Sequence, residues 1–415
     1  MLSTLRNALK VEDVRKKILF TLMMFLVFRI GAHIPVPNIN PLAIKELTEQ
    51  AKLLGFFDLI SGGAFKNFSI FAMSITPYIN ASIIIQLLTV IVPRLEELAK
   101  EDRKKIVEYT RYLTVVLAFI QAIGISFGFK RALIDTSMGS IALVALTLTA
   151  GTACLMWIGE LITEKGIGNG ISLIIFAGIV SRIPAGTVYL FNYAQGGGMN
   201  VLHILGFLII ALISIVATIA INEGQRRIPV QYAKRVVGRK VYGGQSTHIP
   251  IKVNSAGVIP VIFAMSILMF PGTIASWFPD NGAAVWISTH MTFDNLIYNI
   301  FYALLIIFFT YFYSAITFNP VDVADNIKKN GGFIPGLRPG RPTAEYITKI
   351  MSRITLFGAL FLAIIAILPT LLTSFTGLQI YFGGTSLLIV VGVALDTMKQ
   401  LESNMLMRSY EGFMK

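Results

Sequence analysis

Charge is scarce in this sequence. Only 14% of its 415 residues are charged, 55% are hydrophobic, and the mean hydropathy is +0.71. Soluble domains carry about 25% charged residues, so the composition excludes an ordinary water-soluble fold and indicates a chain that lies largely in lipid. Acidic residues are fewer than basic ones: the chain has 22 Asp and Glu and 35 Lys and Arg, which gives a net charge of +13.

Cysteine and catalytic groups are also scarce. The single cysteine, Cys154, excludes an intramolecular disulfide. It lies in an apolar run, where we expect a small buried hydrophobic side chain. The four histidines have no metal-ligand spacing, and the sequence has no Gly-Lys-Ser/Thr phosphate loop. We therefore expect no enzyme activity, no metal and no cofactor.

Long hydrophobic runs, in contrast, fill most of the chain. A helix needs about 20 apolar residues to cross the bilayer core. Ten stretches approximately meet that need and predict an all-α polytopic membrane protein: 18–36, 72–92, 112–128, 140–159, 170–190, 201–221, 254–278, 296–318, 354–373 and 383–399.

Few charged residues lie inside these stretches. Arg29, Arg182 and Asp396 each lie toward an end, where a long side chain can reach the interface or pair locally. A secondary transporter for a small solute remains the alternative, but it usually needs ionisable residues near the bilayer midplane. A membrane-embedded enzyme would need a paired catalytic constellation, and none is visible.

The basic residues predict the orientation. Most of the 35 lysines and arginines fall in the N-terminal tail, in alternate loops and in the C-terminal tail. With an even number of spans, the positive-inside rule places both termini in the cytoplasm. Two of these basic loops, 223–252 and 319–353, are longer than a helix connection requires, so we expect them to carry function rather than only to set topology.

The segment near 37–71, on the opposite side, is unusual. It begins with prolines, contains Ser61-Gly62-Gly63, and its second half, 56–71, is apolar but interrupted by glycine. Such a piece is too hydrophobic for a free loop and too short to cross a bilayer. It could be a re-entrant element surrounded by protein or by a water-filled cavity.

Several motifs resemble the SecY family, and the resemblance covers nearly the whole chain. They are FRIGAHIPVP (28–37), SIFAMSITPYINASIIIQLLT (69–89), GIGNGISLIIFAGI (166–179), QYAKRVVGRKVYGGQSTHIP (231–250), FIPGLRPGRPT (333–343) and YFGGTSLLIVVGVALD (381–396). One departure is KEDRKKI at 100–106, where the family usually has a Gly-Glu-x-Gly-Arg-Arg-like turn before the third helix.

The resemblance implies ten helices in two inverted, pseudosymmetric five-helix halves, residues 1–190 and 191–415, with a pore between them. It maps a narrow pore ring to Ile75, Ile79, Ile171, Ile175, Ile262 and Ile389. Branched apolar side chains hydrate poorly, so such a ring would block ions by dewetting and would make no specific hydrogen bonds with a passing chain.

The resemblance also implies a plug and a lateral gate. The plug is the apolar segment at about 57–69, with Phe57, Ser61, Gly62, Gly63, Phe65 and Phe68. The gate would lie between helices two and three and helices seven and eight, and would carry the polar residues Gln86, Gln121 and Asn254. Polar groups in lipid favour mutual hydrogen bonds of about 0.6 kcal/mol, which could hold a gate shut yet let a signal peptide open it.

The family's partners would dock on the basic loops. The resemblance implies the SecA ATPase and the ribosome at Arg235, Arg239, Lys240, Arg338 and Arg341, with the SecE and SecG membrane subunits completing the complex. It implies a bacterial inner-membrane channel that passes unfolded preproteins across the membrane and releases membrane helices sideways into lipid.

Overall fold

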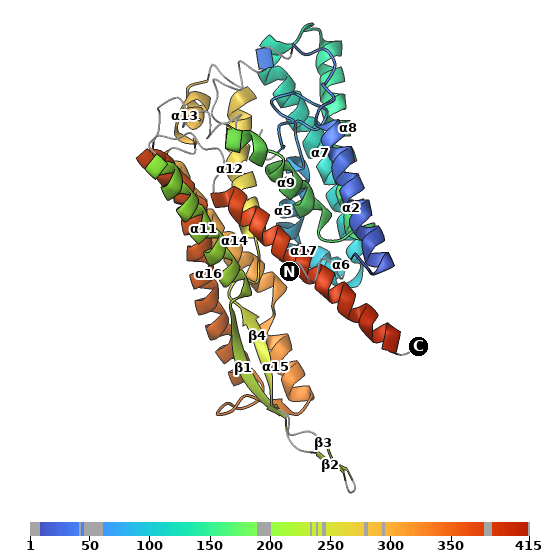
Figure 1. The fold of residues 1–415 in the computed structure, drawn as a ribbon, viewed down its shortest axis with the longest axis vertical. Helices are drawn as coiled ribbons and strands as arrows, with labels where there is room; N and C mark the ends of the chain where they lie inside the picture. The colour runs from blue at the N-terminus through green and yellow to red at the C-terminus, as the bar shows by residue number, and fades with distance from the viewer. Residues whose placement is uncertain are drawn as a thin grey trace.

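The structure is a computed structural model. It describes residues 9–40, 43–44, 61–188, 201–232, 235–237, 240–242, 246–277, 281–292, 295–376 and 384–413. The described chain is an elongated bundle of helices with a small β-structure projecting from one end (Figure 1). Helix α13 (Gly282–His290) lies at the end of the bundle opposite this projection (Figure 1).

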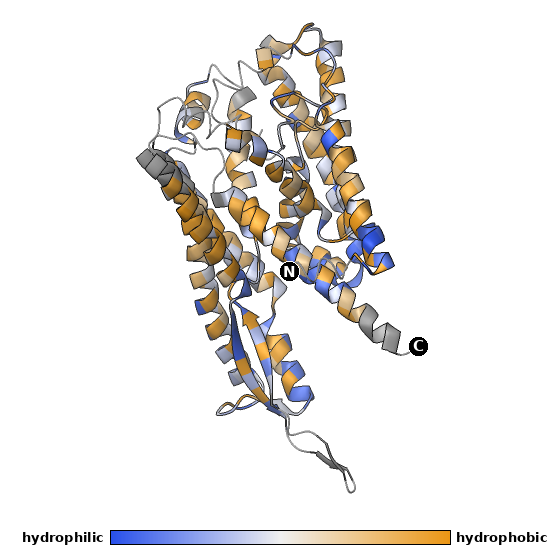
Figure 2. Ribbon diagram, viewed as in Figure 1, coloured by the Kyte–Doolittle hydropathy of each residue, from blue (hydrophilic) through white to orange (hydrophobic). Residues whose placement is uncertain are grey.

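A helix occupies each of the ten apolar stretches. These helices are α2 (Glu12–Gly31), α5 (Thr76–Ile91), α7 (Arg103–Gly128), α8 (Met138–Lys165), α9 (Gly170–Val180), α11 (Val201–Glu223), α12 (Ile259–Trp277), α14 (Leu296–Thr317), α16 (Arg341–Thr376) and α17 (Gly384–Phe413). Apolar residues dominate these helices, and hydrophilic residues gather at the projection and at the neighbouring helix ends (Figure 2).

Several boundaries differ from the expected ones. Helix α2 ends at Gly31 rather than near residue 36, because Pro35 and Pro37 cannot continue a helix and Pro35 instead forms a β-bridge with Ser69. Helices α7 and α16 begin well before their apolar stretches, and α17 continues past its own. In these cases helical turns that contain polar residues extend the helix beyond the apolar stretch.

Length and composition alone identify fewer spans than ten. Within the described residues, five helices are long and apolar enough to cross a membrane unaided. A sixth span is formed if α5 and α6 (Pro93–Glu101) count as one, although they are bent by 109° at Val92 and Pro93. In α11 and α12, the apolar helical segments Leu208–Glu223 and Ile259–Ala275 are shorter than a full span.

The helices pack as two neighbouring groups. In the first, α7 packs on α8 and α5, and α8 on α2 and α9. In the second, α14 packs on α12 and α16, and α17 on α11 and α16. The groups meet along two seams, α12 against α5 and α7, and α17 against α9 and α2. The inverted symmetry between the halves stays a prediction.

Close glycine packing fixes the first group. A side chain on Gly151 of α8 would collide with the carbonyl of Ile70, and one on Gly170 of α9 with the carbonyl of Gly159. The glycines at 166–170 therefore form a tightly packed helix start.

The expectation for Cys154 is wrong. It is exposed because it lies on the outward face of α8, whereas the neighbouring Leu155 and Met156 are buried.

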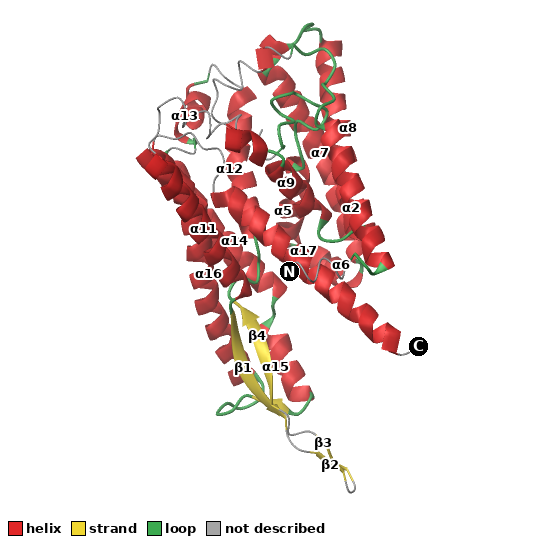
Figure 3. Cartoon of the chain, in the orientation of Figure 1, coloured by secondary structure: helices red, strands yellow, loops and turns green. Residues whose placement is uncertain are grey.

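The described parts of the segment 225–252 are β-strands, which Figure 3 draws in yellow beside the red helices. Strands β1 (Gln225–Tyr232) and β4 (Ser246–Lys252) pair antiparallel, from Gln225 opposite Lys252 to Gln231 opposite Ser246. The short strand β5 (Gly332–Phe333) adds to the other edge of β1, and β2 (Arg235–Val237) pairs with β3 (Lys240–Tyr242).

This projection has its own apolar core. The core joins the sheet to helix α15 (Pro320–Lys329) and to the first turns of α16 through Ile228, Val230, Ile251, Ile327, Ile334, Ile347 and Met351. A connection that only set topology would need no such core. The two long basic loops therefore form one folded unit.

Candidate functional site

The six isoleucines of the predicted ring lie around one apolar cluster. Ile75 precedes α5, which contains Ile79, and α9 supplies Ile171 and Ile175. Ile262 comes from α12 and Ile389 from α17, so both helix groups contribute. Five of the six are buried members of the cluster, and Ile171 is partly buried and packs against it.

This cluster is predominantly apolar. Its buried members are aliphatic residues, methionines and aromatic residues, among which Tyr298 and Tyr302 carry hydroxyl groups. Water in such a space would lose hydrogen bonds without replacement. Contacts of this kind have no preferred direction, so the two helix groups can separate here without breaking specific bonds.

The described part of the plug segment, 61–69, is a series of turns packed inside the protein. Gly62 and Gly63 have φ of 65° and 92°, in the left-handed region that glycine tolerates. The Ser61 hydroxyl accepts the Phe65 N–H at 3.0 Å, and the Ser69 N–H donates to the Ala64 carbonyl at 2.9 Å. The segment is thus a buried, non-helical element; Phe57 lies outside the described residues.

The plug's phenylalanines pack against the end of α7. The rings of Phe65 and Phe68 lie 5.8 Å from that of Phe129, edge to face in each case. Edge-to-face pairs contribute about 0.5–1.5 kcal/mol beyond the area they bury. Both plug rings are buried. The plug is therefore seated mainly on the first helix group.

A charged side chain also fixes the plug. Arg29, near the end of α2, donates from Nη1 to the Gly62 carbonyl at 2.7 Å and to the Ser181 hydroxyl at 3.3 Å. Ser181 in turn donates to the Gly178 carbonyl of α9 at 2.7 Å. Sequence reasoning assigned Arg29 only to the interface or to local pairing. Its actual partner is a backbone carbonyl 33 residues away, which no side-chain pattern reveals.

Of the predicted gate residues, Gln121 lies at the seam between the groups. It is buried on α7 and lines a cavity of about 20 Å³, enough for one water, together with Asn80 of α5 and Ser266 of α12. Phe65 of the plug also lines this cavity. The cavity thus joins gate and plug, and Asn80 is a polar lining residue that the sequence did not single out.

The other two gate residues lie elsewhere. Asn254, in the turn before α12, donates to Asn222 Oδ1 at 2.8 Å and to the Gly257 carbonyl at 3.0 Å, both within its own helix group. Gln86 of α5 is partly buried and donates to Ser82 one turn earlier, at 3.2 Å. The structure therefore does not bring the three polar residues together.

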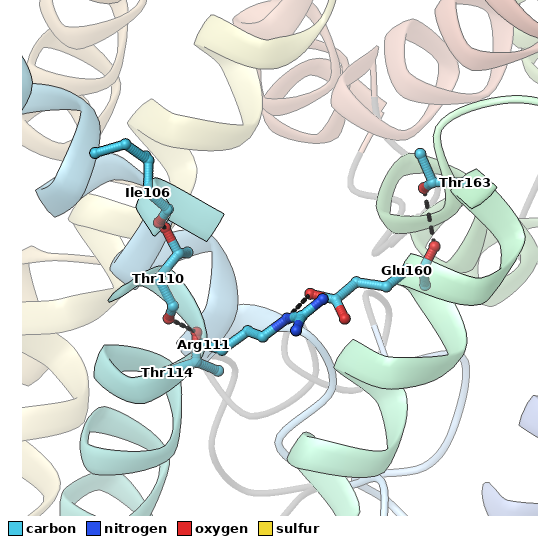
Figure 4. A network of polar contacts seen from close by, with 7 residues as sticks. Ile106, Thr110, Arg111, Thr114, Glu160 and Thr163 are labelled. Carbon is cyan, nitrogen blue, oxygen red and sulfur yellow. Dashed lines mark hydrogen bonds and ion pairs between the residues drawn. The ribbon is translucent and has the colours of Figure 1, made fainter. Parts of the chain in front are cut away.

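Further polar contacts hold the helices of the first group together beside α9. Arg111 of α7 and Glu160 of α8 form an ion pair at 2.8 Å, which Figure 4 shows with the neighbouring threonines. Thr163 of α8 donates to the Gly159 carbonyl and accepts the N–H of Gly170, where α9 begins, at 2.9 Å in each case. This network ties three helices into one body.

The predicted docking residues belong to the projection. Arg338 is exposed between two turns in which Gly336 and Gly340 have φ of 81° and 102°. The Leu337 N–H donates to the Ile334 carbonyl, which closes the first turn. Arg341 is exposed and pairs with Glu345 at 3.0 Å. Arg235 and Lys240 lie on β2 and β3, and Arg239 lies outside the described residues.

The departure at 100–106 forms an ordered corner. Asp102 separates α6 from α7 and accepts the Lys104 N–H at 3.2 Å, which caps α7. Lys105 lies 3.7 Å from the same carboxylate. Aspartate is a favoured N-cap, so this sequence makes the corner without the glycines that the family usually has there.

These features define a polytopic helical membrane protein with a buried apolar cluster between its two helix groups. Within the described residues no group of histidine, cysteine, aspartate and glutamate could hold a metal ion. Comparison with known proteins identifies the family. The family model described as SecY matches residues 69–398.

Two relatives match along the full length of both chains. The protein translocase subunit SecY of Halalkalibacterium halodurans is 52% identical, and that of Bacillus subtilis is 50% identical. Among solved structures, one described as a protein conducting channel matches with a TM-score of 0.67 at 20% identity, covering 94% of this chain and 92% of that one. The chain belongs to the SecY family. It is a subunit of a protein-translocation channel and not an enzyme.

Proposed function

We propose that this chain forms the pore itself, with the isoleucine cluster as its constriction and the segment at 57–69 as its plug. The supporting observation is that isoleucines from α5, α9, α12 and α17, far apart in sequence, surround one buried apolar cluster between the two helix groups. Separation of the groups, residues 1–190 and 191–415, would open a path lined by side chains that make no specific contacts with an unfolded preprotein.

A stalled substrate tests this proposal. In a Cys154→Ser background, a cysteine at Ile389 should form a disulfide with a cysteine in a secretory polypeptide arrested halfway through the channel. Leu146 of α8 is exposed on the bundle surface, so a cysteine there is the matched control. Cross-linking at Leu146 but not at Ile389 would place the path outside the bundle and contradict the proposal.

The gate is the second part of the proposal. The seam of α12 against α5 and α7 is the lateral gate, through which a signal peptide enters and membrane helices leave for lipid. Gln121 and the cavity that it lines lie on this seam. Gln86 and Asn254 remain predicted gate residues, although both hydrogen-bond within their own helix group.

The orientation and the partners follow from charge. We place the chain in a bacterial inner membrane. Its lysines and arginines gather in the two termini and in the loops of the projection, and the positive-inside rule assigns such segments to the cytoplasm. SecE and SecG are its membrane partners by family. SecA and the ribosome dock on the basic projection. One structural neighbour is described as Sec61 in a canine ribosome-channel complex, at 18% identity and a TM-score of 0.63.

The orientation is tested by cysteine labelling. A cysteine at Gly282 should react only with reagents added outside.

Arg338 tests the docking surface. Its exposed side chain lies between two glycine turns, so charge reversal should leave the fold intact. Arg338→Glu should therefore abolish SecA-driven export, while Arg338→Lys retains it. The measurement is preprotein transport into vesicles with equal amounts of inserted channel. Normal transport by Arg338→Glu would show that this charge does not couple the channel to the motor.

A further inference from the structure

A short stretch of backbone links the plug to α5. We call residues 69–74 the connector; it includes Ser69, the last residue of the plug segment. Two non-glycine residues near its ends have left-handed backbone, Phe68 with φ of 41° and Ser74 with φ of 53°. Such a conformation is uncommon for any residue with a side chain and costly for a bulky one. Each of the two is therefore a candidate joint about which the plug could move.

Phe68 ends a helical turn of the plug. The Phe68 N–H donates to the Phe65 carbonyl and the Ser69 N–H to the Ala64 carbonyl, both at 2.9 Å. These two bonds form the Schellman motif, in which the residue after the helical turn is left-handed and is usually glycine. Here a phenylalanine with a buried ring occupies that position. The closed plug therefore holds one strained torsion, the φ of Phe68.

Backbone bonds clamp the connector directly after that torsion. The Val36 N–H donates to the Phe68 carbonyl at 3.0 Å, and the Ile70 N–H donates to the Ile34 carbonyl at 3.0 Å. The two bonds flank the β-bridge between Pro35 and Ser69, so the connector forms a short antiparallel ladder with the chain that follows α2. From the Phe68 carbonyl onward, the backbone is therefore part of the first helix group.

Side-chain packing clamps the same stretch from two helices. A side chain on Gly151 of α8 would collide with the Ile70 carbonyl. A side chain on Gly31 of α2 would collide with the Phe71 ring, which also stacks on the Phe28 ring with centroids 6.2 Å apart. The connector therefore cannot follow the plug unless α2 and α8 move as well. This clamp lies between the plug and Ser74, which leaves Phe68 as the joint.

The contacts of the plug can break while the connector stays. Rotation about the N–Cα bond of Phe68 leaves its own ring and carbonyl in place and moves the residues before it. The rotation breaks the Arg29 bond to Gly62, the two bonds of the Schellman motif, and the contact between the Phe65 and Phe129 rings. Return of φ to negative values relieves the strained torsion and offsets part of that cost.

We propose that the plug leaves the pore by rotation at Phe68, while the connector and Ile75 keep their positions. The inference rests on the proposed plug and adds the location of its pivot. Ile75 lies beyond the clamp and is fully buried in the apolar cluster. Displacement of the plug therefore does not pull on the ring, and the ring can close again before the plug returns.

Hydroxyl-radical labelling of the unmodified chain tests the pivot. Phe65 and Phe71 are matched reporters, because they are the same residue type, are 2% and 3% exposed, and lie on either side of Phe68. Mass spectrometry measures the oxidation of each ring in the membrane-inserted complex, first at rest and then with a secretory polypeptide arrested in the channel. We expect arrest to raise the oxidation of Phe65 roughly tenfold, because a protected ring becomes exposed, and to leave that of Phe71 unchanged.

Two outcomes would overturn the pivot. An equal rise at both rings would mean that the connector moves with the plug, and no rise at Phe65 would mean that the plug does not rotate away. The cross-link between Ile389 and the arrested polypeptide does not depend on how the plug moves. It should therefore still form if the pore proposal is right and only the pivot is wrong.

Two substitutions test the torsion itself. Phe68→Asn and Phe68→Val both remove the ring, but asparagine tolerates a left-handed backbone, whereas β-branched valine does not. In the resting complex, Phe65 should therefore be oxidised roughly tenfold more in the Val variant than in the Asn variant. Equal oxidation of Phe65 in the two variants would show that the backbone of Phe68 does not control the plug.

Discussion

The proposed ring and the proposed plug differ in construction. The ring isoleucines belong to, or pack against, one apolar cluster to which both helix groups contribute, and its contacts are non-directional. The plug is located by specific contacts: a 2.7 Å hydrogen bond from Arg29, a serine-capped turn, and edge-to-face rings around Phe129. A seal without directional bonds can yield to any sequence and close again. A seal with directional bonds has one closed position and must be released from it.

The largest effect should come from making the ring polar. Ile75→Asn with Ile389→Asn would let water enter the constriction, and resting ion conductance should rise about tenfold or more. Leu at the same two positions keeps the apolar surface and should leak far less. Single-channel recording across a planar bilayer without substrate measures both. Equal conductance in the Asn and Leu variants would show that exclusion of water is not how the ring seals.

The next effect concerns the plug's anchor. Arg29→Gln removes a charged hydrogen bond to Gly62, which contributes about 1.5–3 kcal/mol. We expect brief resting openings to become at least roughly tenfold more frequent, because 1.4 kcal/mol corresponds to a factor of ten. The ring should still close between openings, so the current should flicker rather than persist. Ser181→Ala, which loses only the 3.3 Å contact, should change the frequency little.

A smaller effect separates the gate residues. Gln121→Leu replaces an amide that lines the seam cavity with an apolar side chain, so it should strengthen the apolar contact across the seam and slow signal-peptide entry. Asn254→Leu removes a hydrogen bond to Asn222 within one helix group, so it should lower thermal stability without slowing signal-peptide entry. The readout is export of substrates whose signal peptides differ in hydrophobicity. The same response to both variants would remove the distinction.

The smallest effect is expected from the Arg111–Glu160 pair. Arg111 is about half exposed, and exposed pairs contribute about 0.2–1 kcal/mol. Arg111→Gln should lower the unfolding temperature only slightly, and added salt should shrink the difference. Thermal unfolding of the detergent-solubilised complex at two salt concentrations measures this. A large loss would mean that the pair does more than join α7 to α8.

The helices could be predicted from sequence, because hydrophobic runs are local signals. The orientation, which follows from the basic loops, stays a prediction. The ring could not be predicted from the residues themselves: Ile75 looks like any other isoleucine, and only the family resemblance grouped the six. The Arg29–Gly62 contact could not be predicted because its acceptor is a backbone carbonyl in a turn. Cys154 was misplaced because an apolar run does not say which helix face meets lipid and which meets protein.

The length of α16 has a mechanical consequence. Its first 28 residues, Arg341–Leu368, form one continuous helix of about 42 Å that begins in the core of the projection and ends deep in the bundle. A continuous helix of this length moves as one rigid unit. If a motor docks at Arg338 as proposed, its push on that exposed loop would therefore reach α14 and α17, on which α16 packs, without direct contact with the isoleucine cluster.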